Sequence, residues 1–180
     1  MPPAPQPPFL MPDAGPLITL AYAGRLDLLL RPGWPLQLVD MVLHELTRNA
    51  TPTRDAIQSF VAEHRPTQVQ TATFLQFHAL QTEAARAPPG PPARKAGLGE
   101  LALQEAINKL ALAQPPQPVV LLFEDHKIAS TAFHLPQETL RVSTRAFLLF
   151  LQEKGWLESA AEVERQAVHA GRKFSQLRFP

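Results

Sequence analysis

The amino-acid sequence predicts an α/β fold with a mostly parallel central sheet. Short apolar runs alternate with longer segments of helical period, which is the order expected when each strand is followed by a crossover helix. The clearest strand, Val119–Phe123, is a continuous apolar run between Pro118 and Glu124, as expected for a strand buried on both faces. A chain of 180 residues, 45% of them hydrophobic, can bury one sizeable core and is short for two. We therefore expect one domain.

The predicted strands are short apolar runs bounded by turn or helix signals. They are Phe9–Met11, Leu36–Val39, Val69–Thr71, Val119–Phe123 and Leu140–Val142. A helix-like segment, Pro16–Ala21, follows the first strand. The other predicted helices are Asp40–Arg48, Thr53–His64, Thr73–Arg86, Gly99–Leu112, Thr144–Lys154 and Glu158–Ala170. Asp40 is expected to cap its helix, and Glu105 is expected to pair with Lys109 on the surface.

Proline interrupts the pattern at a few places. The chain has 20 prolines, and they cluster at residues 2–8, 88–92 and 115–118. We therefore predict a Pro-rich N-terminal tail at residues 1–8 and a single domain over residues 9–180. A Pro-rich insertion is expected around residues 86–97.

Composition excludes several classes of site. Lys and Arg number 17 against 16 Asp and Glu, so contact with a polyanion would need a local basic patch. Cysteine is absent, which excludes disulfides and thiolate metal sites and fits a reducing compartment. The N-terminus lacks the pattern of a signal peptide, and no apolar run approaches the roughly 20 residues that span a bilayer. We expect a cytoplasmic protein without membrane contact.

Carboxylates recur where predicted strands end and predicted helices begin. Asp13 follows the first strand, Glu124 and Asp125 follow the fourth, and Glu45 and Glu100 lie in early turns of helices. Ligands bind beyond the carboxyl ends of strands in open α/β sheets, so these side chains can converge on one crevice. Oxygen ligands without Cys or paired His favour Mg²⁺ or Mn²⁺ over Zn²⁺. Such a site suits the hydrolysis of phosphodiester bonds.

Four of these carboxylates also have a purely structural explanation. Asp13 could form a turn or a cap, Glu45 could pair with Arg48, Glu100 could complement a helix dipole, and Asp125 could cap the segment after it. The choice between Glu124 and Asp125 as the main ligand stays open.

Other motifs are missing or ambiguous. The sequence has no HExxH, GxGxxG, P-loop or GxSxG pattern, and its six histidines are interpreted as surface or packing residues. Basic residues gather near the C-terminus, and two more lie upstream: Arg165, His169, Arg172, Lys173 and Arg178, with Arg141 and Arg145. They could form a phosphate track or an ordinary solvated face.

Several segments, in order, resemble the PIN-domain family. They are Asp13–Ile18, Gly24–Leu29, Val39–Leu46, Gly99–Glu100, Leu121–Asp125, Ser143–Leu148 and Lys154–Leu157, within a region of roughly residues 9–175. The resemblance implies a three-layer α/β/α sandwich and a metal-dependent endoribonuclease. It also implies Asp13, Glu45, Glu100, Glu124 and Asp125 as ligands of Mg²⁺ or Mn²⁺, and Thr144 as a residue that orients the site.

The resemblance further implies a toxin held by a cognate antitoxin, and a homodimer. Arg145, Arg172 and Lys173 are the candidate RNA contacts. Two departures from the family pattern are Ala14 after Asp13, where many members have a hydroxyl residue, and a Glu-Asp pair where Asp-Asp is frequent. These departures motivate the alternative hypothesis of a catalytically degenerate PIN-fold protein that binds or regulates a partner.

Overall fold

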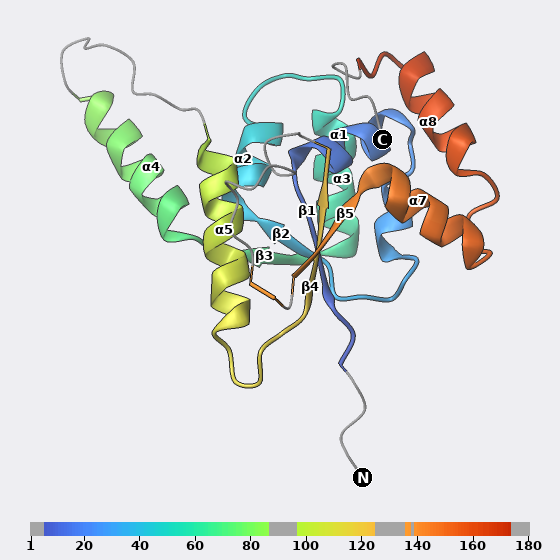
Figure 1. Cartoon of the computed structure of the whole chain (residues 1–180). Coiled ribbons are helices and arrows are strands. Elements are labelled where there is room, and N and C mark those ends of the chain that lie inside the picture. Colours follow the sequence, from blue (N-terminus) through green and yellow to red (C-terminus); the bar gives the residue numbers. More distant parts are fainter. Residues whose placement is uncertain (1–5, 87–96, 125–135, 138, 174–180) are drawn as a thin grey trace.

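A parallel sheet flanked by helices forms the centre of the protein (Figure 1), which confirms the predicted α/β class. The computed structural model describes residues 6–86, 97–124, 136–137 and 139–173. The strands are β1 (Phe9–Pro12), β2 (Gln37–Val39), β3 (Thr67–Val69), β4 (Val119–Phe123) and β5 (Thr139–Ser143). Strands β1, β4 and β5 pair in parallel, as do β2 and β3, and a parallel bridge between Leu10 and Leu36 links the two groups. The resulting order is β3-β2-β1-β4-β5.

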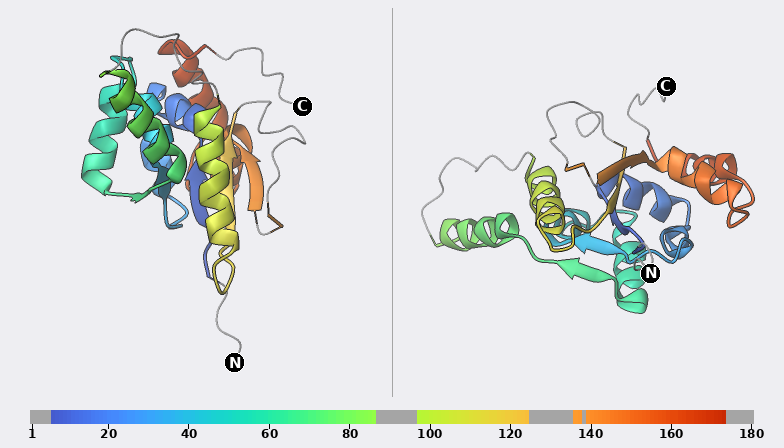
Figure 2. Two further views of the ribbon diagram at one scale, coloured as in Figure 1. Left: turned by 90° about the vertical axis from the view of Figure 1, so that its left-hand side faces the viewer. Right: turned by 60° about the horizontal axis from the view of Figure 1, so that its bottom comes forward.

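Helices cover both faces of this sheet, as expected for an α/β/α sandwich. They are α1 (Ala14–Tyr22), α2 (Asp40–Thr47), α3 (Arg54–His64), α4 (Ala72–Ala84), α5 (Leu98–Ala111), α7 (Thr144–Glu153) and α8 (Ala160–His169), with a 3₁₀ helix η1 (Leu26–Leu30). Helix α5 lies on one side, and α1, α7 and α8 lie together on the other (Figures 1 and 2).

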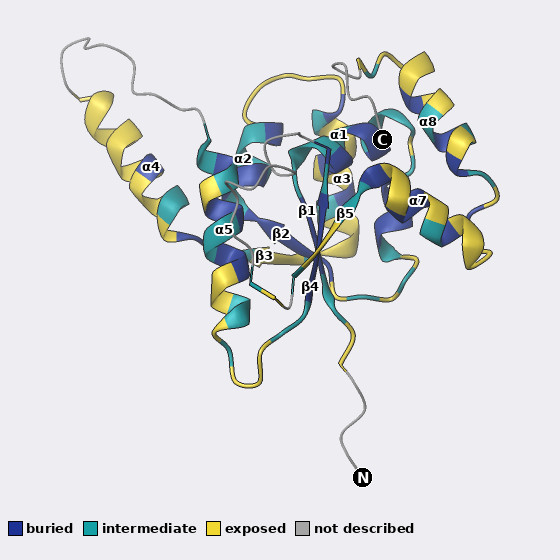
Figure 3. Cartoon of the chain, viewed as in Figure 1, coloured by how far each residue is buried: buried dark blue, intermediate teal, exposed yellow. Residues whose placement is uncertain are grey.

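The core follows from the apolar runs of the central strands. Leu10, Met11, Leu121 and Leu122 are fully buried in β1 and β4, and Phe147 of α7 packs into the same cluster. Figure 3 shows the buried strands at the centre and a largely exposed α4. The central strands therefore form a rigid base for the residues that follow them.

The third strand begins and ends two residues earlier than predicted. Thr71, the end of the predicted strand, is instead the N-cap of α4, and its hydroxyl accepts a hydrogen bond from the Phe74 N–H at 3.2 Å. Asp40 is the first residue of α2 and not its N-cap, which is Val39. The Asp40 carboxylate accepts hydrogen bonds from the Thr71 N–H and hydroxyl, each at 2.8 Å. It therefore ties the start of α2 to the start of α4.

Helix α4 is held to α5 by one carboxylate. Glu105 of α5 accepts hydrogen bonds from the N–H of Ala72 at 2.6 Å and from the N–H and hydroxyl of Thr73 at 3.1 and 3.0 Å. These N–H groups lie in the first turn of α4 and have no partner within the helix. Besides the predicted attraction to Lys109, Glu105 thus caps a neighbouring helix.

Candidate functional site

The carboxyl ends of β1 and β4 lie side by side, and the candidate residues follow them. Asp13 comes directly after β1, and Glu124 comes directly after β4. The N–H of Asp13 donates to the carbonyl of Leu122 at 2.9 Å, so the two strand ends are joined. We call this region the acidic edge and define it by Asp13, Glu45, Glu100 and Glu124.

Asp13 lies at the N-cap of α1 in an extended conformation, with φ −74° and ψ 176°. Its side chain is half-buried and makes no capping hydrogen bond to the helix. The structural explanation of Asp13 as a side-chain cap is therefore wrong, although the residue does occupy the cap position. Asp13 follows a strand end, where a ligand site is expected in this class of fold.

Glu45 and Glu100 approach each other from α2 and α5. The N–H of Gly99 donates a hydrogen bond to the Glu45 carboxylate. A Cβ atom built on Gly99 would lie 2.9 Å from Oε2 of Glu45, so glycine permits this approach. Desolvation raises the pKa of Glu45, and the negative charge of Glu100 raises it further, against the opposing effects of Arg48 and the Gly99 N–H. The half-buried Glu45 carboxylate therefore carries an electrostatic penalty that a bound cation would relieve.

Glu124 is buried and already has a cationic partner. Its Oε2 atom accepts hydrogen bonds from the Thr19 hydroxyl and from Nη2 of Arg172, each at 2.9 Å. Nε of Arg172 also donates to the Thr19 hydroxyl oxygen at 2.9 Å. The Glu124 side chain is only 4% exposed, so the guanidinium of Arg172 balances a charge that water cannot reach.

Oε1 of Glu124 and Oγ1 of Thr144, at the ends of β4 and β5, are buried and have no hydrogen-bond partner among the described residues. Phe123 and Ser143 are paired across these strands, so the residues that follow them are neighbours. The capping hydroxyl of α7 belongs to Ser143, which accepts from the N–H of Ala146 at 3.1 Å. The Thr144 hydroxyl is thus not the cap of α7, and its orienting role stays a prediction.

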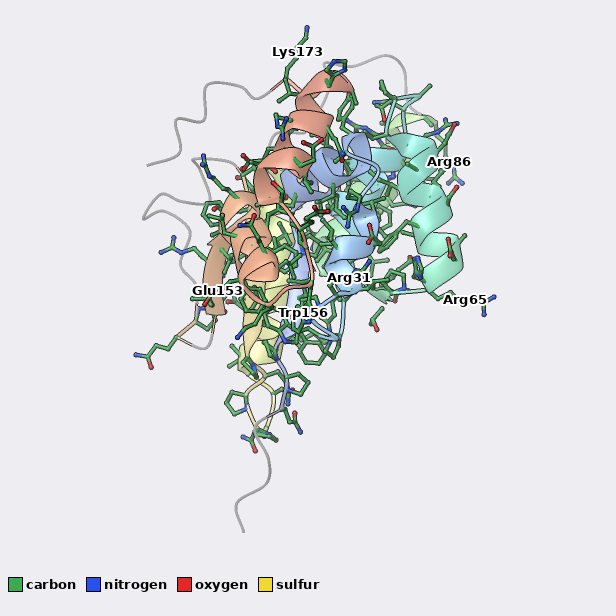
Figure 4. All side chains as sticks on the ribbon, turned by 90° about the vertical axis from the view of Figure 1, so that its right-hand side faces the viewer. Arg31, Arg65, Arg86, Glu153, Trp156 and Lys173 are labelled. Carbon is green, nitrogen blue, oxygen red and sulfur yellow. The ribbon has the colours of Figure 1, made fainter. Side chains whose placement is uncertain are left out.

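The predicted RNA contacts differ in their surroundings. Arg172 belongs to the buried pair with Glu124, and its side chain is 19% exposed. Arg145 is exposed on α7 and lies 4.0 Å from Glu164. Lys173 is exposed, and it projects outward beyond the end of α8 (Figure 4). Of the three, Arg145 and Lys173 have the exposure that a phosphate contact requires.

Not all of the predicted site residues are brought together in the described part of the chain. Glu45 meets Glu100, and Asp13 lies beside the end of β4, but Asp125 falls outside the described residues. Within residues 6–86, 97–124, 136–137 and 139–173, no three Asp, Glu or His side chains form a group that could hold one metal ion. The donors themselves are carboxylates of the kind that Mg²⁺ and Mn²⁺ prefer.

Sequence reasoning gave no role to Thr19, predicted Arg172 as an RNA contact and not as a partner of Glu124, and missed the packing roles of Gly15 and Gly99. Thr19 and Arg172 engage Glu124, and Gly15 and Gly99 allow two carboxylates to pack closely. A Cβ atom built on Gly15 would lie 2.9 Å from Cβ of Glu124. The glycines next to Ala14 and before Glu100 were a usable signal for close approach. The Arg172 pairing had no local signal, because 48 residues separate its partners.

Comparison with known proteins found a likeness in fold but none in sequence family. No protein-family model matches the sequence, and no curated protein matches it. Among solved structures, the chain is similar to the PIN domain of T. brucei RRP44, with 16% identity and a TM-score of 0.48. The alignment covers 83% of this chain and 82% of that chain. The likeness concerns the fold alone. No helix among the described residues is long and apolar enough to cross a membrane.

Proposed function

We propose that the protein is a metal-dependent endoribonuclease that hydrolyses phosphodiester bonds of RNA. The observation that carries the proposal is the approach of Glu45 and Glu100 at the carboxyl edge of a parallel sheet. Two like charges near each other, one of them half-buried, lower the stability of the folded state when both are ionised. Proteins retain such arrangements at functional sites, where the penalty is offset by a ligand.

The residues proposed to hold Mg²⁺ or Mn²⁺ are the Glu45–Glu100 pair together with Asp13 and Asp125. The described residues alone do not offer three acidic ligands to one ion, so the proposed set includes Asp125 from the sequence. When bound, such an ion supplies Lewis-acid stabilisation of a phosphodiester and lowers the pKa of an attacking water. Arg145 and Lys173 are proposed to contact RNA phosphates. The sequence resemblance extends the proposal to a cytoplasmic toxin with a cognate antitoxin, and to a homodimer.

The test compares RNA cleavage by the wild-type protein and by Glu45→Gln in Mn²⁺, in Mg²⁺ and in chelator. We expect the chelator to abolish RNA cleavage by the wild-type protein. Glu45→Gln should cleave RNA at least about 100-fold more slowly, because losing a residue that only supports a metal ligand already lowers metal affinity or activity about 10- to 100-fold. DNA of the same sequence serves as the substrate control. Glu63→Gln is the matched protein control, since Glu63 is an exposed carboxylate on α3.

Stability provides a second readout for the same variant. Because burial raises the folded-state pKa of Glu45, its ionised form destabilises the fold at neutral pH, and Gln removes that penalty. Glu45→Gln should therefore unfold no more easily than wild type. Cleavage that survives in Glu45→Gln or in chelator would contradict the proposal. A wild-type protein that cleaves no RNA would favour the alternative, a PIN-fold binding or regulatory protein.

A further inference from the structure

We infer that Arg172, Thr19 and Glu124 form one positioning unit that sets the place of Asp13 at the acidic edge. The inference rests on the proposed function, since Asp13 is one of its metal-binding residues. It assigns Glu124 to the support of the site and not to the metal, and it makes Arg172, which follows α8, part of the site.

The unit joins three elements that are far apart in sequence. Thr19 lies in α1, Glu124 follows β4, and Arg172 follows α8. Their three hydrogen bonds are each 2.9 Å long, and two of them end on the same oxygen, Oε2 of Glu124. The Arg172 guanidinium reaches both partners because its Nε and Nη2 donors point in parallel, which an ammonium group cannot reproduce. Helices α1 and α8 are also in contact with each other.

The backbone around Arg172 directs its side chain into this junction. Gly171 follows the C-cap residue of α8, Ala170, and has φ +107°, a conformation that other residues rarely adopt. The N–H of Arg172 donates to the carbonyl of Ala167 at 2.9 Å. The chain therefore turns back towards α1 immediately after the helix. The position of Arg172 is set by this turn and by its two hydrogen-bond partners.

Asp13 is linked to the unit by close packing. The first turn of α1 lies against the stem of Glu124, where a Cβ on Gly15 would be 2.9 Å from the Glu124 Cβ. Thr19 fixes the same helix to the carboxylate of Glu124 from its next turn. The N–H of Asp13 is bonded to Leu122 of β4 at 2.9 Å. Helix α1 is thus held at two points against β4, and Asp13 is at its start.

Glu124 differs from the other acidic residues of the site in the charges that surround it. A buried ion pair contributes little net stability compared with an apolar replacement, so its value lies in the geometry that it imposes. Arg172 already neutralises the carboxylate of Glu124, and a divalent cation there would have to compete with it. Glu45 instead has a second carboxylate, Glu100, nearby. A positioning role for Glu124 and a ligand role for Glu45 follow from this difference.

The test is calorimetric titration of the full chain with Mn²⁺, together with thermal unfolding and RNA cleavage. The variants are Arg172→Met, Glu124→Gln and the double variant, measured at a temperature where circular dichroism shows each to be folded. We expect each single change to weaken Mn²⁺ affinity about tenfold. The double variant should be no weaker than either single variant, because the residues act as one unit. Arg172→Lys should stay weakened, since it keeps the charge and loses the second donor.

The matched control is Arg165→Met, which removes an exposed arginine of α8 that pairs with Glu162. Its Mn²⁺ affinity should equal that of wild type. Tighter Mn²⁺ binding by Arg172→Met would overturn the inference, because Arg172 would then be a competing cation and Glu124 a ligand. A lower unfolding temperature with unchanged Mn²⁺ affinity would also overturn it, as would additive losses in the double variant.

If the proposed function is wrong, Mn²⁺ binding and RNA cleavage give a different set of results. If wild type binds Mn²⁺ but cleaves no RNA, the nuclease proposal fails, while the affinities of the variants still decide whether the unit positions the site. If wild type binds no Mn²⁺, the positioning inference is overturned as well.

Discussion

Replacing Glu105 with alanine should release the start of α4 from α5. The carboxylate holds two N–H groups and one hydroxyl of the first turn of α4, at 2.6 to 3.1 Å. A helix cap is worth about 1 kcal/mol, and a hydrogen bond to a charged group contributes about 1.5–3 kcal/mol when buried. Glu105 is partly exposed, so water replaces part of each bond in the variant. We expect Glu105→Ala to lower the free energy of unfolding by about 2 kcal/mol.

The pH dependence of this loss follows from the pKa of Glu105. Desolvation tends to raise this pKa, but the hydrogen bonds from Ala72 and Thr73 and the charge of Lys109 outweigh it, so the folded-state pKa is lowered from 4.5. A carboxyl group with a lowered folded-state pKa contributes stability that is present above its unfolded pKa and is lost as the pH falls through the folded value. The difference between wild type and Glu105→Ala should therefore be largest above pH 4.5 and narrow below it.

Urea unfolding at neutral and acidic pH measures the global effect, and hydrogen exchange of the Ala72 and Thr73 amides measures the local one. Helix α4 has one buried residue, Phe77, so its first turn should lose protection before the core does. Glu153→Ala is the control, since Glu153 is an exposed carboxylate of α7 (Figure 4). Equal unfolding free energies for wild type and Glu105→Ala, or a difference that grows as the pH falls below 4.5, would refute the reasoning.

Substitutions of Gly15 and Gly99 should distinguish an effect on core packing from an effect on the position of a metal ligand. Gly15→Ala should lower the free energy of unfolding by about 1–3 kcal/mol in thermal denaturation, because its Cβ would meet the Cβ of Glu124, which is fixed to the backbone. Gly99→Ala should leave unfolding nearly unchanged, because it meets the movable end of Glu45 and gains helix propensity. It should weaken Mn²⁺ affinity in calorimetry, since Glu45 must move. A stable Gly15→Ala protein, or Gly99→Ala with wild-type affinity, would contradict this distinction.

The sequence predicted the elements whose signals are local. Val119–Phe123 was a continuous apolar run, and β4 has those bounds because a strand buried on both faces needs apolar side chains at every position. The short strand β3 was misplaced because its residues are mostly exposed, so it has little hydrophobic signal. Thr71 was placed at the end of that strand, while it is in fact the N-cap of α4.

The candidate site was predictable only in part, because only some of its features have a signal in the local sequence. Asp13 and Glu124 could be placed at strand ends because those ends are visible in the sequence. Their neighbours depend on tertiary structure, and the pairing of Glu124 with Arg172 is decided by how α8 packs on α1. A residue interpreted as a possible phosphate contact is thus largely buried in an ion pair.

The acidic edge therefore consists of two parts whose charges are balanced in different ways. Arg172 neutralises Glu124 within the fold, so that part is complete without a ligand. Glu45 and Glu100 repel each other, and Arg48, whose positive charge acts on Glu45, is exposed to solvent. A cation that binds only the folded state would offset this repulsion, by about 2.7 kcal/mol at 100 times its dissociation constant. The Glu45–Glu100 pair, which destabilises the protein when no cation is bound, is thus the place where a metal ion would bind most favourably.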